Sequence, residues 1–187
     1  MKKMLLLACG VLLSWSASAL EVAGVKLADK TQVGNVSLQL NGAGVRTKLF
    51  IKIYVAALYL PQKQTSAEAV VADEGEHSIA LHILRELSGK QLFKAFNDAI
   101  KANHTSVELT VLDPQIKQME KIFEAVNEVK QGDVITLDYS PISGTQIGMD
   151  GIVRGTIVGT TFNRALLKIW LGKKPAQGDL KKALLGG

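Results

Sequence analysis

The sequence predicts an α+β domain in which a large antiparallel sheet is covered by helices on one face. Short apolar segments with strand-like alternation come first, helical patterns follow, and further strands and helices complete the chain. Hairpin-type connections dominate and regular strand–helix–strand alternation is absent, which favours an antiparallel over a parallel sheet. The 187 residues, 47% of them hydrophobic, are enough for one domain with a buried core.

The start of the chain has the pattern of a secretory leader. Lys2 and Lys3 precede an apolar run over 4–15, and Ala17-Ser18-Ala19 follows as a small-x-small cleavage pattern. This arrangement predicts a signal peptide over 1–19, cleaved near Ala19. An apolar run of about 12 residues is too short for a membrane anchor, which needs about 20. The mature domain is predicted to be 20–187, in a periplasmic or secreted location.

Composition excludes several classes of function. The only cysteine, Cys9, lies in the leader; lipid attachment there is an alternative to cleavage, and without Cys9 no internal disulfide can form. Loss of Lys2 and Lys3 lowers the net charge from +5 to +3, and the remaining basic residues are dispersed, so no nucleic-acid partner is predicted. No membrane span is expected in the mature chain, because no other apolar run is long enough.

The patterns also disfavour metal and nucleotide chemistry. His77 and His82 are five residues apart on a predicted strand, so they point to opposite faces, and no cysteine remains to join them. The glycine-rich segment 41–44 leads into a strand, whereas a phosphate-binding loop leads into a helix. No activated nucleophile is evident. We therefore predict no metal and no cofactor.

The first half of the chain is read mainly as strands. Strands are predicted over 21–27, 31–40 and 45–60, a short helix over 65–72 and a strand over 77–84. The segment 45–60 is long for a single strand, so a bend or bulge is expected near Lys52.

The second half alternates helices and strands. Ser88 and Gln91 fit a capping box at a helix start, and Asp113-Pro114 is typical of another. Strands are predicted over 134–140, 145–149 and 152–157, with a tight hairpin at Asp150-Gly151. Helices follow over 161–171 and 179–185. Trp170 adjoins the inward stripe of the first of these and is expected to pack rather than bind.

Arg46 and Tyr54 are the candidate site residues from the strand pattern. In 45–60 the odd positions are apolar, and the even positions, which include Arg46, Phe50 and Tyr54, form a mixed face. An arginine at the end of an apolar channel can bind a carboxylate or an enolate through two parallel hydrogen bonds. A tyrosine can add a hydroxyl donor. The alternative is a solvated face that also carries Lys48 and Lys52.

Several segments, taken together, resemble the chalcone isomerase family. They are Asn41-Gly-Ala-Gly-Val-Arg46, the run 52–60, Gly132-Asp133 before a strand, and the C-terminal stretches 155–159, 162–172 and 180–186. The chain is most similar to the secreted bacterial branch of that family. The resemblance implies an open-faced β-sandwich with a cleft between sheet and helices. In plant isomerases this cleft binds a flavonoid, and in related proteins of the fold an arginine and a tyrosine hold a fatty-acid carboxylate.

The resemblance also shows where this chain departs from the plant enzymes. Arg46 matches the motif arginine, and the strand threonine of the enzymes corresponds to Tyr54. Their C-terminal serine or threonine falls near Asn163, whereas their catalytic tyrosine falls near Leu92 and their active-site asparagine near Ala99. The implied ligand-binding residues are therefore Arg46, Tyr54 and Asn163, without the hydroxyl network of the enzyme.

Three functional hypotheses follow. The first is an exported, non-catalytic protein that binds a small apolar acid such as a fatty acid. The second is an isomerase or intramolecular lyase that acts on a conjugated substrate through Arg46. The third is a structural or partner-binding envelope protein in which the cleft is packed core. The sequence does not predict an oligomeric state.

Overall fold

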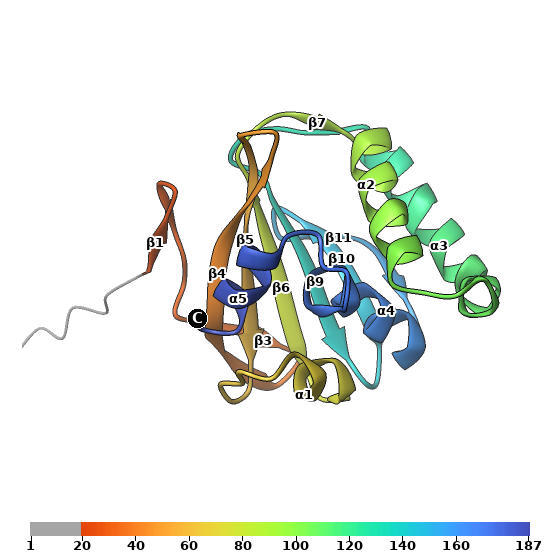
Figure 1. The fold of residues 1–187 in the computed structure, drawn as a ribbon, viewed down its shortest axis with the longest axis horizontal. Helices are drawn as coiled ribbons and strands as arrows, with labels where there is room; N and C mark the ends of the chain where they lie inside the picture. Colours follow the sequence, from red (N-terminus) through yellow and green to blue (C-terminus); the bar gives the residue numbers. More distant parts are fainter. Residues whose placement is uncertain (1–19) are drawn as a thin grey trace, which may run out of the picture.

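The structure, a computed structural model, describes residues 20–187 and is built on a seven-stranded antiparallel sheet (Figure 1). The predicted signal peptide, 1–19, lies outside the described residues. In spatial order the strands are β11 (Ile152–Ile157), β10 (Gly144–Met149), β9 (Val134–Ser140), β6 (His77–Ile83), β5 (Ile51–Leu60), β4 (Val36–Lys48) and β3 (Lys30–Val33). Two short ladders join β1 (Glu21–Val22) to β2 (Val25–Lys26) and β7 (Leu87–Ser88) to β8 (Glu128–Val129).

The helices cover one face of this sheet. They are α1 (Ala67–Ala72), α2 (Gly89–Ala102), α3 (Ser106–Val126), α4 (Thr160–Leu171) and α5 (Gly178–Leu184). Their buried side chains form the main core with sheet residues such as Leu58 and Ile79. A smaller apolar cluster on the opposite face joins Val55 and Tyr59 to Leu27, beside the β1–β2 hairpin. The predicted open-faced β-sandwich of the α+β class is thus confirmed.

Two local motifs form as the sequence predicts. The Ser88 side chain accepts from the backbone N–H of Gln91, and the Gln91 side chain accepts from the backbone N–H of Ser88, which completes the capping box of α2. Asp150 and Gly151 connect β10 and β11 with positive φ values of 51° and 77°. Positive φ at both central residues is the geometry of a type I′ hairpin turn, which favours Asp-Gly.

The prediction of one strand over 45–60 is wrong. β4 ends at Lys48 and β5 begins at Ile51, with a two-residue turn at Leu49 and Phe50. The odd positions were expected to form a buried apolar face, but Leu49 at this turn is 82% exposed. The error has a physical reason: neither turn residue is a glycine, asparagine or proline, the usual marks of a turn. A bulge does occur next to the expected position, at Ile53, where the register shifts.

Two further predicted strands are also hairpins. The segment 21–27 folds into β1 and β2 around Ala23 and Gly24, both with positive φ. The segment 31–40 contains the turn between β3 and β4, where Gly34 has a φ of 55°. Glycine reaches such conformations without steric strain, and the two glycines were the available signals.

The helix expected to start at Asp113-Pro114 starts earlier. α3 begins at Ser106, and Thr105 and Glu108 form its capping box. Pro114 lies inside the helix, and Asp113 forms an ion pair of 2.8 Å with Lys117 one turn later. The Thr-x-x-Glu pattern at 105–108 was the sequence signal for this start.

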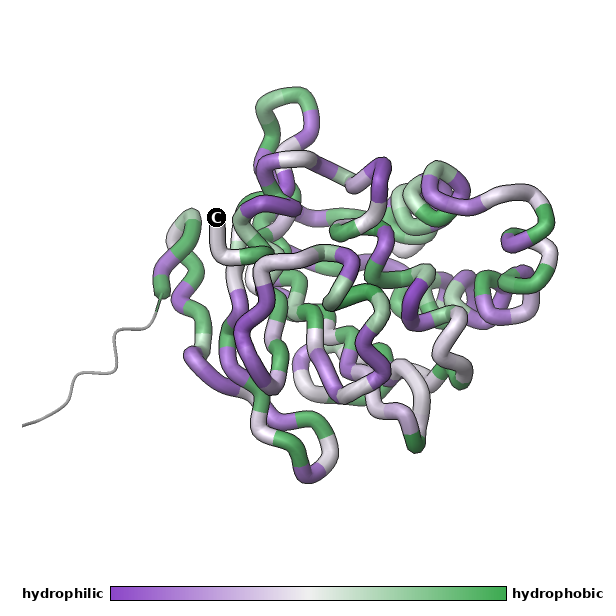
Figure 2. The backbone as a smooth tube through the Cα atoms, turned by 60° about the horizontal axis from the view of Figure 1, so that its bottom comes forward, coloured by the Kyte–Doolittle hydropathy of each residue, from purple (hydrophilic) through white to green (hydrophobic). Residues whose placement is uncertain are grey.

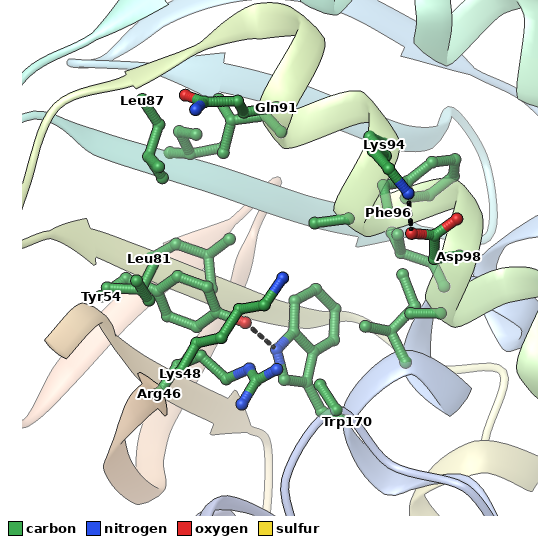
Figure 3. A pocket seen from close by; sticks show the side chains of 18 of the residues that line it. Arg46, Lys48, Tyr54, Leu81, Leu87, Gln91, Lys94, Phe96, Asp98 and Trp170 are labelled. Carbon is green, nitrogen blue, oxygen red and sulfur yellow. Dashed lines mark hydrogen bonds and ion pairs between the residues drawn. The ribbon is translucent and has the colours of Figure 1, made fainter. Parts of the chain in front are cut away.

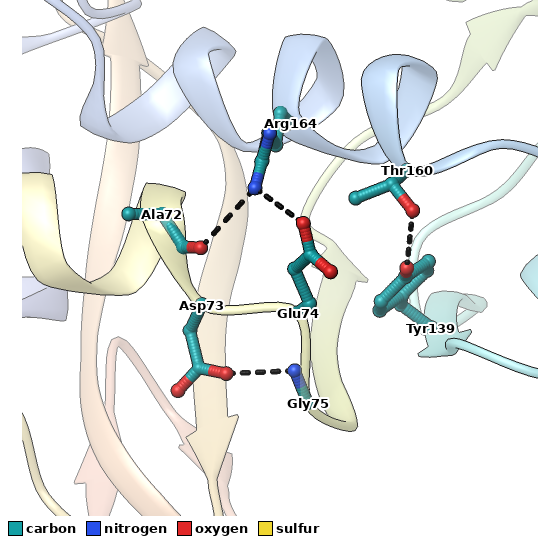
Figure 4. A network of polar contacts seen from close by, with 7 residues as sticks. All are labelled: Ala72, Asp73, Glu74, Gly75, Tyr139, Thr160 and Arg164. Atoms are coloured by element: carbon teal, nitrogen blue, oxygen red, sulfur yellow. Dashed lines mark hydrogen bonds and ion pairs between the residues drawn. The ribbon is translucent and has the colours of Figure 1, made fainter.

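Polar contacts fix α4 against its neighbours (Figure 4). Arg164 donates from Nη2 to the Glu74 carboxylate at 2.6 Å and to the Ala72 carbonyl at 3.4 Å, both in the segment that closes α1. The hydroxyls of Thr160 and Tyr139 are 3.2 Å apart, which links the start of α4 to β9. These contacts hold α4 over the sheet as one wall of the cavity described below.

Candidate functional site

A cavity of about 550 Å3 lies between the helix-covered face of the sheet and helices α2, α3 and α4 (Figure 3). Most of its lining is apolar and comes from Leu81 and Leu137 on the sheet, Phe96 on α2, Met119 on α3 and Leu166 on α4. Its volume falls within the range of small-molecule sites, about 300–1,000 Å3. The cleft implied by the sequence resemblance is therefore present in this structure.

Arg46 and Tyr54 lie together at one end of this cavity. They are partners in the antiparallel ladder of β4 and β5, so their side chains share the helix-covered face. The bulge at Ile53 directly follows this pair in the register. The prediction that Arg46 and Tyr54 share a face of the sheet is met, but by pairing across a hairpin and not by alternation along one strand.

Trp170 sets the hydrogen bonding of Tyr54. Its indole Nε1 donates to the Tyr54 hydroxyl at 3.0 Å. Because an indole N–H can only donate, the Tyr54 oxygen is the acceptor and its own proton remains available to a ligand. Burial raises the pKa of Tyr54, opposed in part by the Trp170 hydrogen bond and the Arg46 charge. Tyr54 is therefore a neutral donor at pH 7. Trp170 packs as expected, and it also lines the cavity.

Gln177, which the sequence analysis missed, positions Arg46. Its side-chain oxygen accepts from Arg46 Nη1 at 3.2 Å and from the Thr47 backbone N–H at 2.8 Å, and its Nε2 donates to the Val45 carbonyl at 3.3 Å. Arg46 Nη1 also donates to the Thr47 carbonyl at 2.7 Å. These bonds orient the guanidinium, a planar group that can bind both oxygens of a carboxylate.

The cavity mouth is basic. Besides Arg46, the lining includes Lys48, Arg85, Lys94 and Lys174. Among the described residues, the carboxylate that lines the cavity is that of Asp98. It is exposed, and its Oδ2 forms an ion pair of 2.6 Å with Lys94 Nζ (Figure 3). A cleft lined by one sign of charge raises the local concentration of oppositely charged ligands. The arrangement thus favours a ligand that carries an anionic group.

Asn163 does not join Arg46 and Tyr54. It lies on α4 with 1% of its surface exposed, outside the cavity lining. Its side-chain oxygen is 3.0 Å from Nε2 of His77, whose ring stacks on Tyr139. The structure thus places this predicted ligand residue in a buried polar contact between α4 and β6.

Leu92 and Ala99 line the cavity from α2. The resemblance places the catalytic tyrosine and asparagine of the plant enzymes near these two positions, and neither side chain here can transfer a proton. Within residues 20–187, no three histidine, cysteine, aspartate or glutamate side chains gather as metal ligands. None of the helices in that range combines the length and apolar character needed to cross a membrane.

The chalcone isomerase-like family model matches residues 19–186. The chain belongs to the chalcone isomerase-like family. A crystal structure of a fatty-acid-binding protein from Arabidopsis thaliana is similar to this member, with a TM-score of 0.65 and 15% sequence identity. The match covers 87% of this chain and 92% of the Arabidopsis chain. Comparison with curated proteins gave no match. The family expected from sequence is thereby confirmed.

Proposed function

We propose that this chalcone isomerase-like protein binds a small apolar acid, such as a fatty acid, without converting it. One observation carries the proposal: the apolar cavity ends at the Arg46–Tyr54 pair, where a charged donor and a neutral donor lie side by side. An apolar tail would occupy the cavity and a carboxylate would meet the two donors. The fold shared with a fatty-acid-binding protein of Arabidopsis is consistent with this assignment.

Elementary energetics support such a ligand. Each methylene moved from water into an apolar site contributes about 0.8 kcal/mol. A hydrogen bond to a charged group contributes about 1.5–3 kcal/mol. The tail therefore supplies most of the affinity, and the basic end selects an acid over an alcohol or ester of the same length.

The lining favours binding over the isomerase alternative. Arg46 and Tyr54 could stabilise an enolate, but the reaction also needs a group to move a proton. Leu92 and Ala99, near the positions where the plant enzymes have a tyrosine and an asparagine, offer none, and the lining carboxylate Asp98 is exposed and paired with Lys94. The structural alternative expects packed core beside Arg46, whereas a cavity lies there.

We also propose that the protein acts outside the cytoplasm, in the periplasm or after secretion. Support comes from the leader pattern of 1–19, with its cleavage signal at Ala17-Ser18-Ala19. N-terminal sequencing of the mature protein from its native source should begin at Leu20. A mature protein that retains 1–19 would contradict the proposal.

Titration of the delipidated protein with a long-chain fatty acid tests the ligand. Calorimetry should show saturable binding, and Arg46→Ala should weaken it by about 10- to 100-fold, the loss of one charge-assisted bond. Arg154→Ala is the matched control, because Arg154 is exposed on β11 and lies outside this cavity. Equal affinity of Arg46→Ala and wild type would refute the anchor. Turnover of phenolic enones above background would favour the isomerase instead.

A further inference from the structure

The β4–β5 hairpin ends in an exposed apolar tip, formed by Leu49, Phe50 and Ile51. Their side chains are 82%, 100% and 49% exposed, respectively. The hairpin ends near the β7 segment in Figure 1, and in Figure 2 its end protrudes at the top and is green, hence hydrophobic. A fully exposed phenylalanine gains nothing from folding, so the fold of the domain does not account for this tip.

The backbone of the tip departs from the usual turn chemistry. Leu49 and Phe50 have φ values of 49° and 65°, the left-handed conformation of a type I′ turn. Such turns favour Asn-Gly, because a larger side chain is strained there. The chain thus holds two bulky apolar residues in an unfavourable conformation and buries neither. Local rules are broken in this way where a function depends on the residues concerned.

Positively charged side chains lie next to the tip. Lys48 and Lys52 flank it on the two strands, and both are exposed. Lys48 also lines the cavity mouth, together with Arg85 at the end of β6. The apolar tip and the open end of the cavity therefore adjoin, with lysines between them.

We propose that this tip docks into an anionic lipid surface and brings the cavity mouth to it. Leu49, Phe50 and Ile51 enter the apolar layer, while Lys48 and Lys52 remain at the phosphate groups. Docking itself is independent of the cavity. The proposal has a second part, which rests on the proposed function: an apolar acid passes between the lipid layer and the cavity while the tip is docked.

A lipid surface fits this tip better than a protein partner. Stable protein interfaces bury about 1,200–2,000 Å2, far more than three residues at a turn supply. A lipid layer accepts a small apolar projection, and basic residues around it gain about 1 kcal/mol each near anionic headgroups. An apolar tip flanked by two exposed lysines is thus complementary to an anionic membrane.

Fluorescence of Phe50→Trp tests insertion. Vesicles of equimolar phosphatidylglycerol and phosphatidylcholine should shift its emission to the blue, after subtraction of the wild-type spectrum from Trp170. Ile142→Trp is the matched control, since Ile142 is 94% exposed in the β9–β10 turn at the opposite end of the sheet. Insertion is refuted if Phe50→Trp shows no shift, or if Ile142→Trp shifts equally.

The double variant Leu49→Asn, Phe50→Gly separates docking from folding. It installs the residues that a type I′ turn favours, so thermal stability should be maintained or raised. Its affinity for the same vesicles should fall at least tenfold, by an order-of-magnitude estimate from the lost Phe burial. Lys52→Ala should lower affinity about fivefold for anionic vesicles and leave neutral vesicles unaffected. Wild-type vesicle affinity in the double variant would overturn the proposal.

Uptake measurements separate the two parts of the proposal. The double variant should bind a free fatty acid as wild type does, but extract it more slowly from vesicles. Vesicle binding by a wild-type protein that binds no fatty acid would refute the proposed function and leave docking intact. Equal extraction rates in both proteins would refute the transfer role.

Discussion

Arg46 and Tyr54 are direct partners in the β4–β5 ladder. Side chains at such positions are about 4.5–5.5 Å apart at Cβ, so the hairpin alone brings the guanidinium and the phenol to one place. Gln177 and Trp170 then fix one group each through hydrogen bonds of 3.2 and 3.0 Å. Contacts within the protein therefore organise the polar end of the cavity.

Tyr54→Phe should weaken fatty-acid binding about tenfold, because one hydrogen bond to the carboxylate is lost. It should also lower the free energy of unfolding by about 1 kcal/mol, since Trp170 Nε1 loses its acceptor. Without residues 1–19, Trp170 is the single tryptophan, so its fluorescence reports on this site directly. If Tyr54→Phe binds the fatty acid as tightly as wild type, and the Trp170 emission of neither protein changes on binding, the carboxylate binds elsewhere.

Affinity should rise about fourfold with each methylene added to a saturated fatty acid, which corresponds to about 0.8 kcal/mol. The increase should stop once the tail fills the cavity of about 550 Å3. Calorimetry over a series of chain lengths measures both the slope and the plateau. An affinity independent of chain length would mean that the tail stays outside the cavity.

Stability should decrease as the pH falls below about 6.5. Burial lowers the pKa of His77 from its usual 6.5, although its hydrogen bonds to Gly75 and Asn163 oppose the shift. Between the lowered pKa and 6.5 the unfolded chain binds more protons than the folded one, so acid favours unfolding. Burial also lowers the pKa of His82.

Urea unfolding across this pH range measures the effect. His77→Gln should flatten the profile more than His82→Gln, because His77 is the more deeply buried of the two. A profile that keeps its full slope in both variants would assign the pH dependence to other groups.

Gly42→Ala should lower the free energy of unfolding by about 1–3 kcal/mol, the usual effect of overpacking. A methyl group there would collide with the backbone carbonyls of Ala183 and Leu184 on α5. Gly178→Ala is the control, because its added methyl would meet open space. Chemical denaturation of both variants decides the matter, and equal stabilities would show that α5 moves aside freely.

The fold class was predictable because several local signals agreed with it. The Ser88–Gln91 capping box, the Asp150-Gly151 turn and the helix stop at Gly172 all lie where the sequence places them. The turns at Gly24 and Gly34 and the start of α3 at Thr105 had local signals that the strand and helix patterns outweighed. The turn at Leu49 and Phe50 lacks turn residues, and its apolar side chains imitate a continuous strand.

The site was predictable only in part. Arg46 and Tyr54 could be named from residue type and the family motif, although the pattern placed them on one strand. Gln177 could not be found in this way, because its role depends on α5 packing against β4, far along the chain. Asn163 was named from the family motif alone, and that motif could not show that its side chain contacts His77 instead of the Arg46–Tyr54 pair.

The contacts of β4 with residues 177–184 determine when this part of the protein can fold during synthesis. Asn41 donates to the carbonyl of Leu184 at 2.7 Å, and Gln177 holds Arg46. The ribosome makes residues 177–184 more than a hundred residues after β4. A nascent chain therefore cannot complete the Arg46 end of the cavity until residues 177–184 have been made.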